Sequence, residues 1–419
     1  MTATRIDTLE PIPIPERPPE EHLSPRDWAR KNLFGSRLDT VLTIVFGLVV
    51  AWLVYRLGKF VFVDARWEII ERNITNLMVS RFPRDELWRV WGALLVLGPS
   101  LGFGAGTAAA ARRREVEEGR AVAIHERYSA LRRAGPILLL VAVLLWFAQS
   151  FQATLLTVAV GALGVGGYFL GRRLALEGRK AALIVLAGIV LAFAIVMAFG
   201  GVGWEDWGGL MLTVFLAVGG ILLAFPFGVL LALGRRSSLP AVRMVCVAYI
   251  ELFRGVPLIA VLFMGAFMIG FLLPPGVEQP SLVTRALIAL VLFTAAYVAE
   301  IVRGGLQGVP AGQVEAAQAL GLSPFRITYR IVLPQALRTV IPALVGQFIS
   351  LFKDTSLVAI IGLAELLNVS RNITTQPDFL AQGLIVETLL FAAFVYWTGA
   401  YWMSRESQRL ERRLGLGER

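Results

Sequence analysis

Charged and hydroxyl-bearing side chains stand together inside one otherwise apolar stretch of the sequence. Lys353 and Asp354 lie near the middle of that stretch, and Thr355 and Ser356 follow them directly. Charged side chains are costly in lipid, so by default they raise the hypothesis of a functional site. Lys353 offers a cation, whereas Asp354 and the two hydroxyl groups offer acceptors. Together the four residues could bind a small solute that carries both charges.

A pair of opposite charges in the preceding apolar stretch gives an alternative to that solute path. Glu300 and Arg303 are three residues apart, which places them on one face of a helix, and the simplest interpretation is an intrahelical ion pair. Either residue could instead pair with Lys353 or Asp354 in a structural lock. Lys353 and Asp354 could also satisfy each other, so solute path and lock both remain open.

Glu251 and Arg254 repeat the three-residue spacing just before a sequence that should break a helix. Gly255-Val256-Pro257 follows directly, and proline removes a backbone donor and clashes with the preceding turn. Broken helices at membrane depth commonly line cavities rather than face lipid. The sequence therefore offers this break, with Glu251 and Arg254, as a second candidate for a solute pathway.

A polar run from Glu315 to Pro334 interrupts the apolar stretches. The residues up to Leu320 favour a short helix, and Gly321 is suited to the position just beyond its end. Ser323-Pro324 can begin a second short helix, since proline is favoured in a first turn. We expect this second helix to stop before Pro334. Two short helices would form a compact knob for a partner, the alternative being an amphipathic helix on the membrane surface.

Long apolar helices must position all of these residues. The chain has 419 residues, 56% of them hydrophobic, and a mean hydropathy of +0.68, whereas soluble domains are about 45–50% apolar. Helical segments of roughly 20 apolar residues cross a bilayer. The sequence predicts an all-α integral membrane protein with about ten transmembrane helices, at 39–62, 87–110, 136–150, 153–171, 181–200, 210–234, 245–272, 283–304, 339–362 and 382–403. The pair 136–150 and 153–171 could instead be a re-entrant or interfacial element.

The charges of the loops give the expected orientation. Loop 111–135 holds seven arginines against four glutamates, while the segment 64–86 holds four arginines against five acids. Cytoplasmic loops are enriched in Lys and Arg, so the first loop should be inside and the second outside. Both termini are then cytoplasmic. Because the net charge of +10 comes largely from short basic loops, we expect no nucleic-acid partner.

Several residue patterns argue against catalysis or ligand chemistry on this chain. Cys246 is the only cysteine, and the two histidines have no partners for metal or triad chemistry. The sequence has no G-x-x-x-x-G-K-[ST] phosphate-binding loop. Close-spaced glycines such as Gly102, Gly104 and Gly106, or Gly161, Gly164, Gly166 and Gly167, are expected to permit close helix packing instead.

The polar run resembles, position for position, the EAA loop of permease subunits of bacterial ABC importers. Four further motifs resemble the permeases of polar amino-acid importers of the histidine/glutamine type: Trp207–Thr213, Tyr249–Leu258, Ala295–Gly305 and Phe352–Leu357. The extra N-terminal spans and Arg81–Trp88 resemble, more weakly, the longer permeases of general L-amino-acid (glutamate/glutamine/aspartate/asparagine) importers. The five C-terminal spans are similar to the minimal core of a type I importer permease.

The resemblance implies a transport subunit that is not itself an enzyme. The EAA loop, 312–334, would dock on a separate ATPase that binds ATP and Mg, leaving no cofactor on this chain. The resemblance assigns ATPase coupling to Glu315, Ala316, Ala317, Gly321, Leu322, Ser323 and Pro334. Glu315 would meet a basic residue of the ATPase, the two alanines would permit close approach, and Gly321 would allow the turn. The hypothetical substrate pathway comprises Lys353, Asp354, Thr355, Ser356, Glu300, Glu251 and Arg254.

Further partners follow from the same resemblance. They are an extracytoplasmic amino-acid-binding protein, a second permease subunit that is related rather than identical, the amino-acid substrate and membrane lipids. The expected location is the bacterial inner membrane. A stand-alone secondary transporter and a membrane scaffold that recruits a soluble partner remain the alternatives.

The sequence divides into four expected regions. Residues 1–37 should be a disordered cytoplasmic tail, 38–205 extra transmembrane helices, 206–404 the importer domain and 405–419 a basic cytoplasmic tail. The first region is polar and rich in proline, and it lacks the apolar core and cleavage site of a signal peptide.

Overall fold

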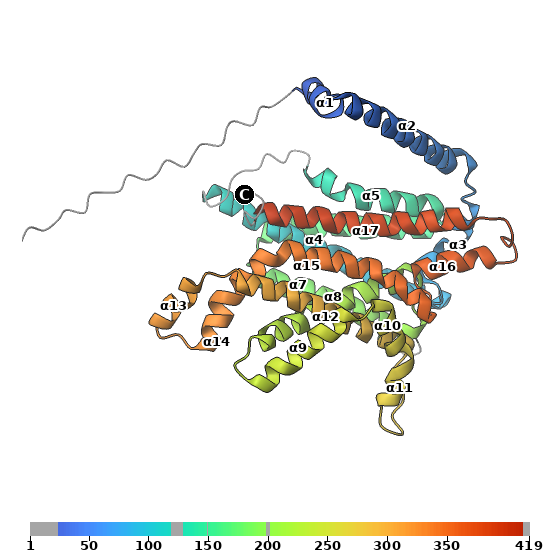
Figure 1. The fold of residues 1–419 in the computed structure, drawn as a ribbon. Coiled ribbons are helices and arrows are strands. Elements are labelled where there is room, and N and C mark those ends of the chain that lie inside the picture. Colours follow the sequence, from blue (N-terminus) through green and yellow to red (C-terminus); the bar gives the residue numbers. More distant parts are fainter. Residues whose placement is uncertain (1–23, 119–128, 149, 198–201, 414–419) are drawn as a thin grey trace, which may run out of the picture. The chain divides into compact units, whose positions relative to one another are not determined.

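The computed structural model describes residues 24–118, 129–148, 150–197 and 202–413. Within these ranges the chain is helical, apart from turns and one isolated bridge between Gly209 and Glu365 (Figure 1). The chain divides after Ala65 into two compact units. The prediction of an all-α protein is therefore confirmed for the described residues.

The first unit contains two helices, α1 (Pro25–Leu33) and α2 (Arg37–Lys59). Ser24 and Ser36 cap their N-termini by accepting a hydrogen bond from a backbone N–H in the first turn. The last turn of α2 continues as a π-helix over Phe60–Asp64. Helix α1 lies within the tail expected to be disordered, so that expectation is wrong for these residues; residues 1–23 lie outside the described part.

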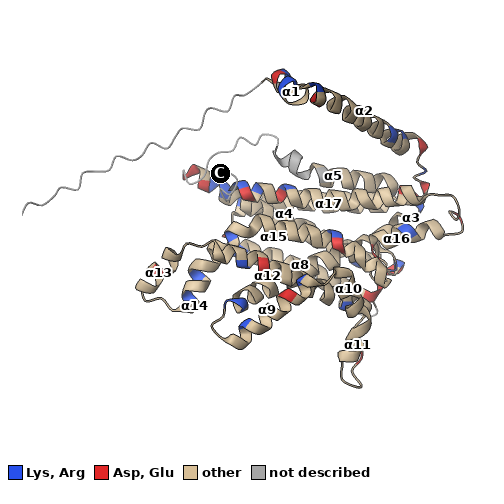
Figure 2. Cartoon of the chain, in the orientation of Figure 1, with Lys and Arg blue, Asp and Glu red and all other residues tan. Residues whose placement is uncertain are grey.

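The second unit begins with α3 (Glu68–Val79), an amphipathic helix whose buried face includes Ile69, Ile70 and Leu77. It is followed by α4 (Leu87–Glu117), α5 (Ser129–Ala148), α6 (Phe151–Leu174) and α7 (Gly178–Met197). Helix α4 packs against both α6 and α7. The long helices are largely free of charge along their middle turns, as Figure 2 shows.

The rest of this unit is built from the C-terminal helices. They are α8 (Gly209–Arg235), α9 (Pro240–Gly255), α10 (Leu258–Phe263), α11 (Ile269–Leu272), α12 (Leu282–Gln307), α13 (Ala311–Ala319), α14 (Pro324–Ile327), α15 (Leu333–Asp354), α16 (Leu366–Asn372) and α17 (Ile385–Arg413). Helix α12 packs against α8, α9 and α15, which makes it the centre of this group. The final helix continues past residue 403, the end expected from the sequence, to Arg413.

The described helices agree with the expected number of spans. Eight are long and apolar enough to cross a membrane, and a ninth span arises if the bent pair Pro240–Gly255 and Leu258–Leu272 is counted as one. The remaining expected span, 136–150, corresponds to a shorter apolar helix, Ile137–Phe147. Whether 136–171 forms two full spans stays open, because α6 is a candidate span whereas the apolar part of α5 described here covers only Ile137–Phe147.

The break predicted at Gly255–Pro257 is present. Helix α9 ends at Gly255, α10 begins at Leu258, and the two segments are bent by 108°. A π-helical turn over Met264–Met268 then interrupts the second segment. This span is the most discontinuous of the described group.

The expectation that the helix after Ser323 stops before Pro334 is wrong. Helix α14 passes through a π-turn at Thr328–Val332 directly into α15, and Pro334 sits in the first turn of α15. The N–H of Leu333 bonds to the carbonyl of Thr328, five residues back. Proline is tolerated here because a first turn needs no N–H donor from it.

Helix α3 is held to the loop between α16 and α17. The side-chain amides of Asn73 and Gln376 exchange hydrogen bonds of 2.8 and 3.2 Å. Arg66 adds bonds to the side chain and backbone of Gln382. Apolar residues of α3, α16 and α17 form one buried cluster beneath these contacts.

Candidate functional site

The polar run forms two short helices joined by a tight turn, which we call the knob (residues 311–334). Gly321 has φ +71°, a left-handed conformation that favours glycine. Its N–H bonds to Gln318 O at 2.9 Å, and the N–H of Leu322 bonds to Ala317 O at 3.2 Å. This pair of bonds is the Schellman motif, which satisfies the last carbonyls of α13.

One face of the knob is part of the protein core. Ala317, Ile327 and Val332 are buried in the same cluster as residues of α8, α9, α12 and α15. Arg236, just after α8, donates a hydrogen bond of 3.0 Å to the carbonyl of Leu306 at the end of α12. The knob is therefore tied to the helices that precede and follow it.

The opposite face of the knob carries large exposed apolar side chains that the sequence analysis did not single out. Leu320 is 80% exposed, Phe325 77% and Tyr329 63%. The rings of Phe325 and Tyr329 stack with centroids 6.1 Å apart. Exposed apolar residues that gather in one place are typical of interaction surfaces. The sequence does contain an indication of this surface, because Phe325 and Tyr329 are four residues apart on a helix and so lie on one face of it.

The residues assigned to coupling differ in accessibility. Glu315 and Ala316 are exposed on α13, and Glu315 has no ion-pair partner among the described residues. Ala317 is only 2% exposed and packs inward, so it is not available for direct contact with a partner. Ser323 and Pro334 are exposed, and Leu322 is half-buried.

Charged residues of three helices meet in a second site, which we call the arginine cluster (Arg235, Glu251, Arg254, Glu300 and Arg303). Glu300 Oε2 lies 3.5 Å from Arg235 and 3.6 Å from Arg254, and Arg303 Nε donates to it at 3.0 Å. Glu251 bonds to Arg235 at 3.0 Å. The cluster joins α8, α9 and α12.

The contacts within the arginine cluster show which of the ion pairs considered from the sequence are formed. The intrahelical pair Glu300–Arg303 is confirmed. Glu251 and Arg254 do not pair with each other among the described contacts, because each is bound across to another helix. Arg235 was missed, since as the last residue of a span it has the usual signature of a headgroup anchor.

Lys353 and Asp354 lie at the end of α15, where the chain changes to a 3₁₀ helix over Thr355–Ile361. Lys353 is exposed and Asp354 is half-buried. The described residues show no ion pair between them and none with Glu300 or Arg303. The described part of the chain therefore shows no salt bridge for the structural-lock alternative, although the neighbouring charges of Lys353 and Asp354 attract each other.

The two hydroxyl residues that follow are turned toward the backbone. Thr355 is fully buried and donates to Phe352 O at 2.7 Å, while the half-buried Ser356 donates to Lys353 O at 2.8 Å. Of the four residues, Lys353 and Asp354 are the two whose side chains form no hydrogen bond among the described contacts.

Glu365 is a buried carboxylate that the sequence analysis missed. It is 0% exposed and caps α16, accepting bonds from the backbone N–H groups of Leu367 and Asn368 at 2.8 and 2.7 Å. Tyr396 donates a further bond of 2.9 Å. Burial raises the pKa of Glu365 above its ordinary value, and these donors oppose the shift. No sequence signal marked it, since a lone loop glutamate is usually solvated.

Comparison with known proteins finds one matching family and relatives that extend over most of the chain. Residues 224–415 match the family described as "Binding-protein-dependent transport system inner membrane component". The chain is 36% identical to the inner membrane amino-acid ABC transporter permease protein YhdY of Escherichia coli K12, over 95% of this chain and 96% of that protein.

Two further relatives cover different shares of the chain. The glutamate/glutamine/aspartate/asparagine transport system permease protein BztC of Rhodobacter capsulatus is 33% identical, over 98% of this chain and 97% of its own length. A solved amino acid ABC transporter, crystallised with histidines, shares 30% identity over 49% of this chain and 92% of its own, with a TM-score of 0.43.

Proposed function

Because the chain belongs to the amino-acid ABC transporter permeases, we propose that it conducts polar L-amino acids inward, driven by ATPase subunits that dock on the knob. Permease subunits of this family are not themselves enzymes, and the chain is a multi-pass protein of the inner membrane. In this proposal an extracytoplasmic binding protein delivers the amino acid, and ATP and Mg are bound by the ATPase.

One observation carries the coupling role, namely that the knob has two opposite faces. Its outer face presents Leu320, Phe325 and Tyr329 with Glu315 nearby, a combination of apolar anchors and charge that suits a protein groove. Its inner face, through Ala317 and Ile327, is packed into the helix core. A push on the outer face would therefore be transmitted to the spans.

The helix after the knob provides a direct mechanical connection. Helical segments run without a break from Pro324 to Ile361. From Pro324 to Lys353 this is about 44 Å at 1.5 Å per residue. A tilt of the knob would then move Lys353 and Asp354, which are the proposed contacts of the substrate. The π-turn at Thr328–Val332 is the point where this lever can bend.

Lys353 and Asp354 support a pathway because the side chain of neither forms a salt bridge or a hydrogen bond with another described residue. A lysine facing lipid in mid-span is costly, so its exposed side should face water or a second permease. An amino acid carries a carboxylate that Lys353 could bind and an ammonium that Asp354 could accept. We propose a related permease, rather than a second copy, as the other half of the pathway.

The loop charges support the proposed orientation, with both termini and the knob in the cytoplasm. Basic residues end or begin the helices on that side, for example Arg172 and Arg173 in the last turn of α6. ATP is available only in the cytoplasm. The knob can therefore couple to an ATPase only if it lies on that side of the membrane.

The proposal is tested by reconstitution in liposomes with the ATPase and the binding protein. We expect uptake of labelled glutamate, glutamine, aspartate or asparagine only when ATP and both partners are present. Uptake that persists without the ATPase would contradict the importer and favour a secondary transporter. Recruitment of the ATPase without any amino-acid uptake would favour a scaffold.

A further inference from the structure

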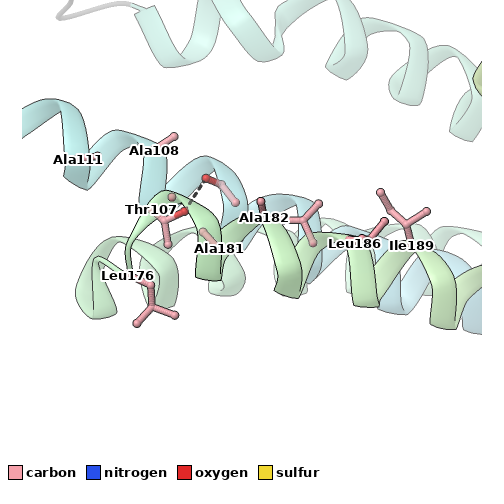
Figure 3. A pocket seen from close by; sticks show the side chains of 11 residues that line it. Thr107, Ala108, Ala111, Leu176, Ala181, Ala182, Leu186 and Ile189 are labelled. Carbon is pink, nitrogen blue, oxygen red and sulfur yellow. Dashed lines mark hydrogen bonds between the residues drawn. The ribbon is translucent and has the colours of Figure 1, made fainter. Parts of the chain in front are cut away.

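An apolar groove runs between α4 and α7, away from the knob and the arginine cluster. It has a volume of about 420 Å³, and Figure 3 shows its lining on both helices. The wall residues of α4 are small, with Gly104, Ala108 and Ala111. Those of α7 change from the small Ala181 and Ala182 to the larger Leu186 and Ile189. Thr107 donates its hydroxyl to Gly104 O at 2.8 Å, so the wall stays apolar.

The groove has the length of a lipid chain in one leaflet. Its α7 wall runs from Gly178 to Ile189, about 16 Å at 1.5 Å per residue. Half of a hydrocarbon core of roughly 30 Å is about 15 Å. A groove between two spans that extends this far from one helix end matches the reach of a single acyl chain.

Arginines lie close in the chain to Ala111 and Gly178, the lining residues at one end of the groove. They are Arg112, Arg113 and Arg114 on α4, Arg172 and Arg173 on α6, and Arg179 on α7. The described residues show no ion pair for any of these six, while the nearby Lys180 pairs with Glu177 at 3.7 Å. These six arginines outnumber the glutamates of the same helix ends, Glu115, Glu117, Glu118 and Glu177, and the excess of positive charge attracts an anion.

We propose that this groove binds an anionic phospholipid of the cytoplasmic leaflet. One acyl chain would fill the space left by Gly104, Ala108 and Ala182, and the headgroup phosphate would accept hydrogen bonds from Arg112, Arg173 or Arg179. The small residues explain why no side chain fills the groove. The basic end explains why an anionic lipid is favoured over a zwitterionic one, whose chain would fit equally well. The inference goes beyond transport and relies only on the orientation proposed above.

The test uses the purified full-length protein and native mass spectrometry with phosphatidylglycerol or phosphatidylcholine. We expect one phosphatidylglycerol to be retained, with a much weaker signal for phosphatidylcholine. Replacing Arg112 and Arg179 by Gln should weaken phosphatidylglycerol binding by about 25-fold, taking roughly fivefold per arginine near the membrane surface. The control Arg243→Gln, at an exposed arginine near the start of α9, should leave binding unchanged.

A second variant tests the groove itself. Ala182→Phe should fill the apolar wall and abolish retention, whereas Leu183→Phe, one residue along and 59% exposed outside the lining, should not. Equal retention of both lipids, or retention by Ala182→Phe, would overturn the proposal. Cross-linking of this wall to a second protein in membranes would also overturn it, because a helix would then occupy the groove.

Discussion

Two groups of helices pack in different ways. The N-terminal group is α4, α6 and α7, and the C-terminal group is α8, α9, α12 and α15. In the first group, backbones touch through glycine: a Cβ on Gly102 would overlap the carbonyl of Gly164, and one on Gly106 would overlap that of Tyr168. The second group also has close glycine contacts, at Gly228 and Gly305, but in addition it shares charges between helices through Glu300. The first arrangement allows little movement, whereas the second has contacts that can be exchanged.

Discontinuities of the helices follow the same division. The C-terminal group contains the 108° break after Gly255 and the π-turns at Met264–Met268 and Thr328–Val332. Among the described residues, α6 and α7 are uninterrupted, and α4 is one helix despite Pro99. π-turns often mark functional sites in helices. The difference indicates that the N-terminal group is a fixed support and the C-terminal group the moving part.

The largest effect expected from this comparison is on the glycine contacts. Gly102→Ala should separate α4 from α6, because the clash is with backbone that cannot rotate away, at a cost of about 3 kcal/mol. The amount of folded protein and its melting temperature in detergent should both fall. Gly161→Ala, on α6 with nothing within 4 Å of the added methyl group, is the matched control and should be neutral. A Gly102→Ala protein as stable as the unchanged protein would contradict the claim that α4 and α6 pack through this glycine.

The next effect is on the arginine cluster. Glu300→Gln would leave Arg235, Arg254 and Arg303 facing one another without their shared carboxylate, and their net charge would rise from +1 to +2 when Glu251 is counted. Since Glu300 is 23% exposed, we expect a loss of about 2 kcal/mol rather than the larger cost of a fully buried pair.

Uptake per folded molecule should also fall about tenfold for Glu300→Gln, because the cluster joins three helices of the moving part. Glu251→Gln should lower uptake less, since Glu251 is 56% exposed and, among the described ion pairs, bonds Arg235 alone. Loss of uptake by Glu300→Gln together with loss of folded protein alone by Gly102→Ala would support a moving C-terminal group and a fixed N-terminal group. If both variants lose uptake in proportion to folded protein, the two groups do not differ in this way.

The smallest effect concerns Glu365 and pH. Because burial raises its pKa in the folded protein, the folded state binds the proton more tightly than the unfolded state. The stability from this group is therefore full at low pH and is lost as pH rises through the folded pKa, with a slope of at most about 1.4 kcal/mol per pH unit. Glu365→Gln should flatten the pH dependence of the melting temperature above pH 4.5, the ordinary pKa. An unchanged slope would show that Glu365 is not the titrating group.

The sequence predicted the large features because apolar length and helix breakers are local signals. The spans, the break at Gly255–Pro257 and the turn at Gly321 were all expected from them. The continuity through Pro334 was not, because a π-turn depends on bonds five residues apart that no residue type signals. Close glycine packing was expected and is confirmed at Gly102, although Gly161 has open space.

The site was predicted less completely, because its contacts join distant parts of the chain. Glu251, Arg254 and Glu300 were selected for being charged within spans, but only the fold brings them to Arg235. Glu365 became a candidate only when its burial was known. The roles of Glu315 and of Lys353 with Asp354 remain predictions from the resemblance and from their exposure.

The central claim, that the knob couples the ATPase to the spans, is tested most directly by Glu315→Lys in reconstituted complex. The measured quantity is the stimulation of ATP hydrolysis by binding protein and amino acid. Glu115→Lys, at an exposed glutamate near the end of α4 on the proposed cytoplasmic side and outside the knob, is the charge-matched control. We predict that Glu315→Lys lowers the stimulated rate at least about tenfold, as expected for loss of a charge pair at an interface, while the control retains it. Stimulation that is undiminished in Glu315→Lys would contradict the account.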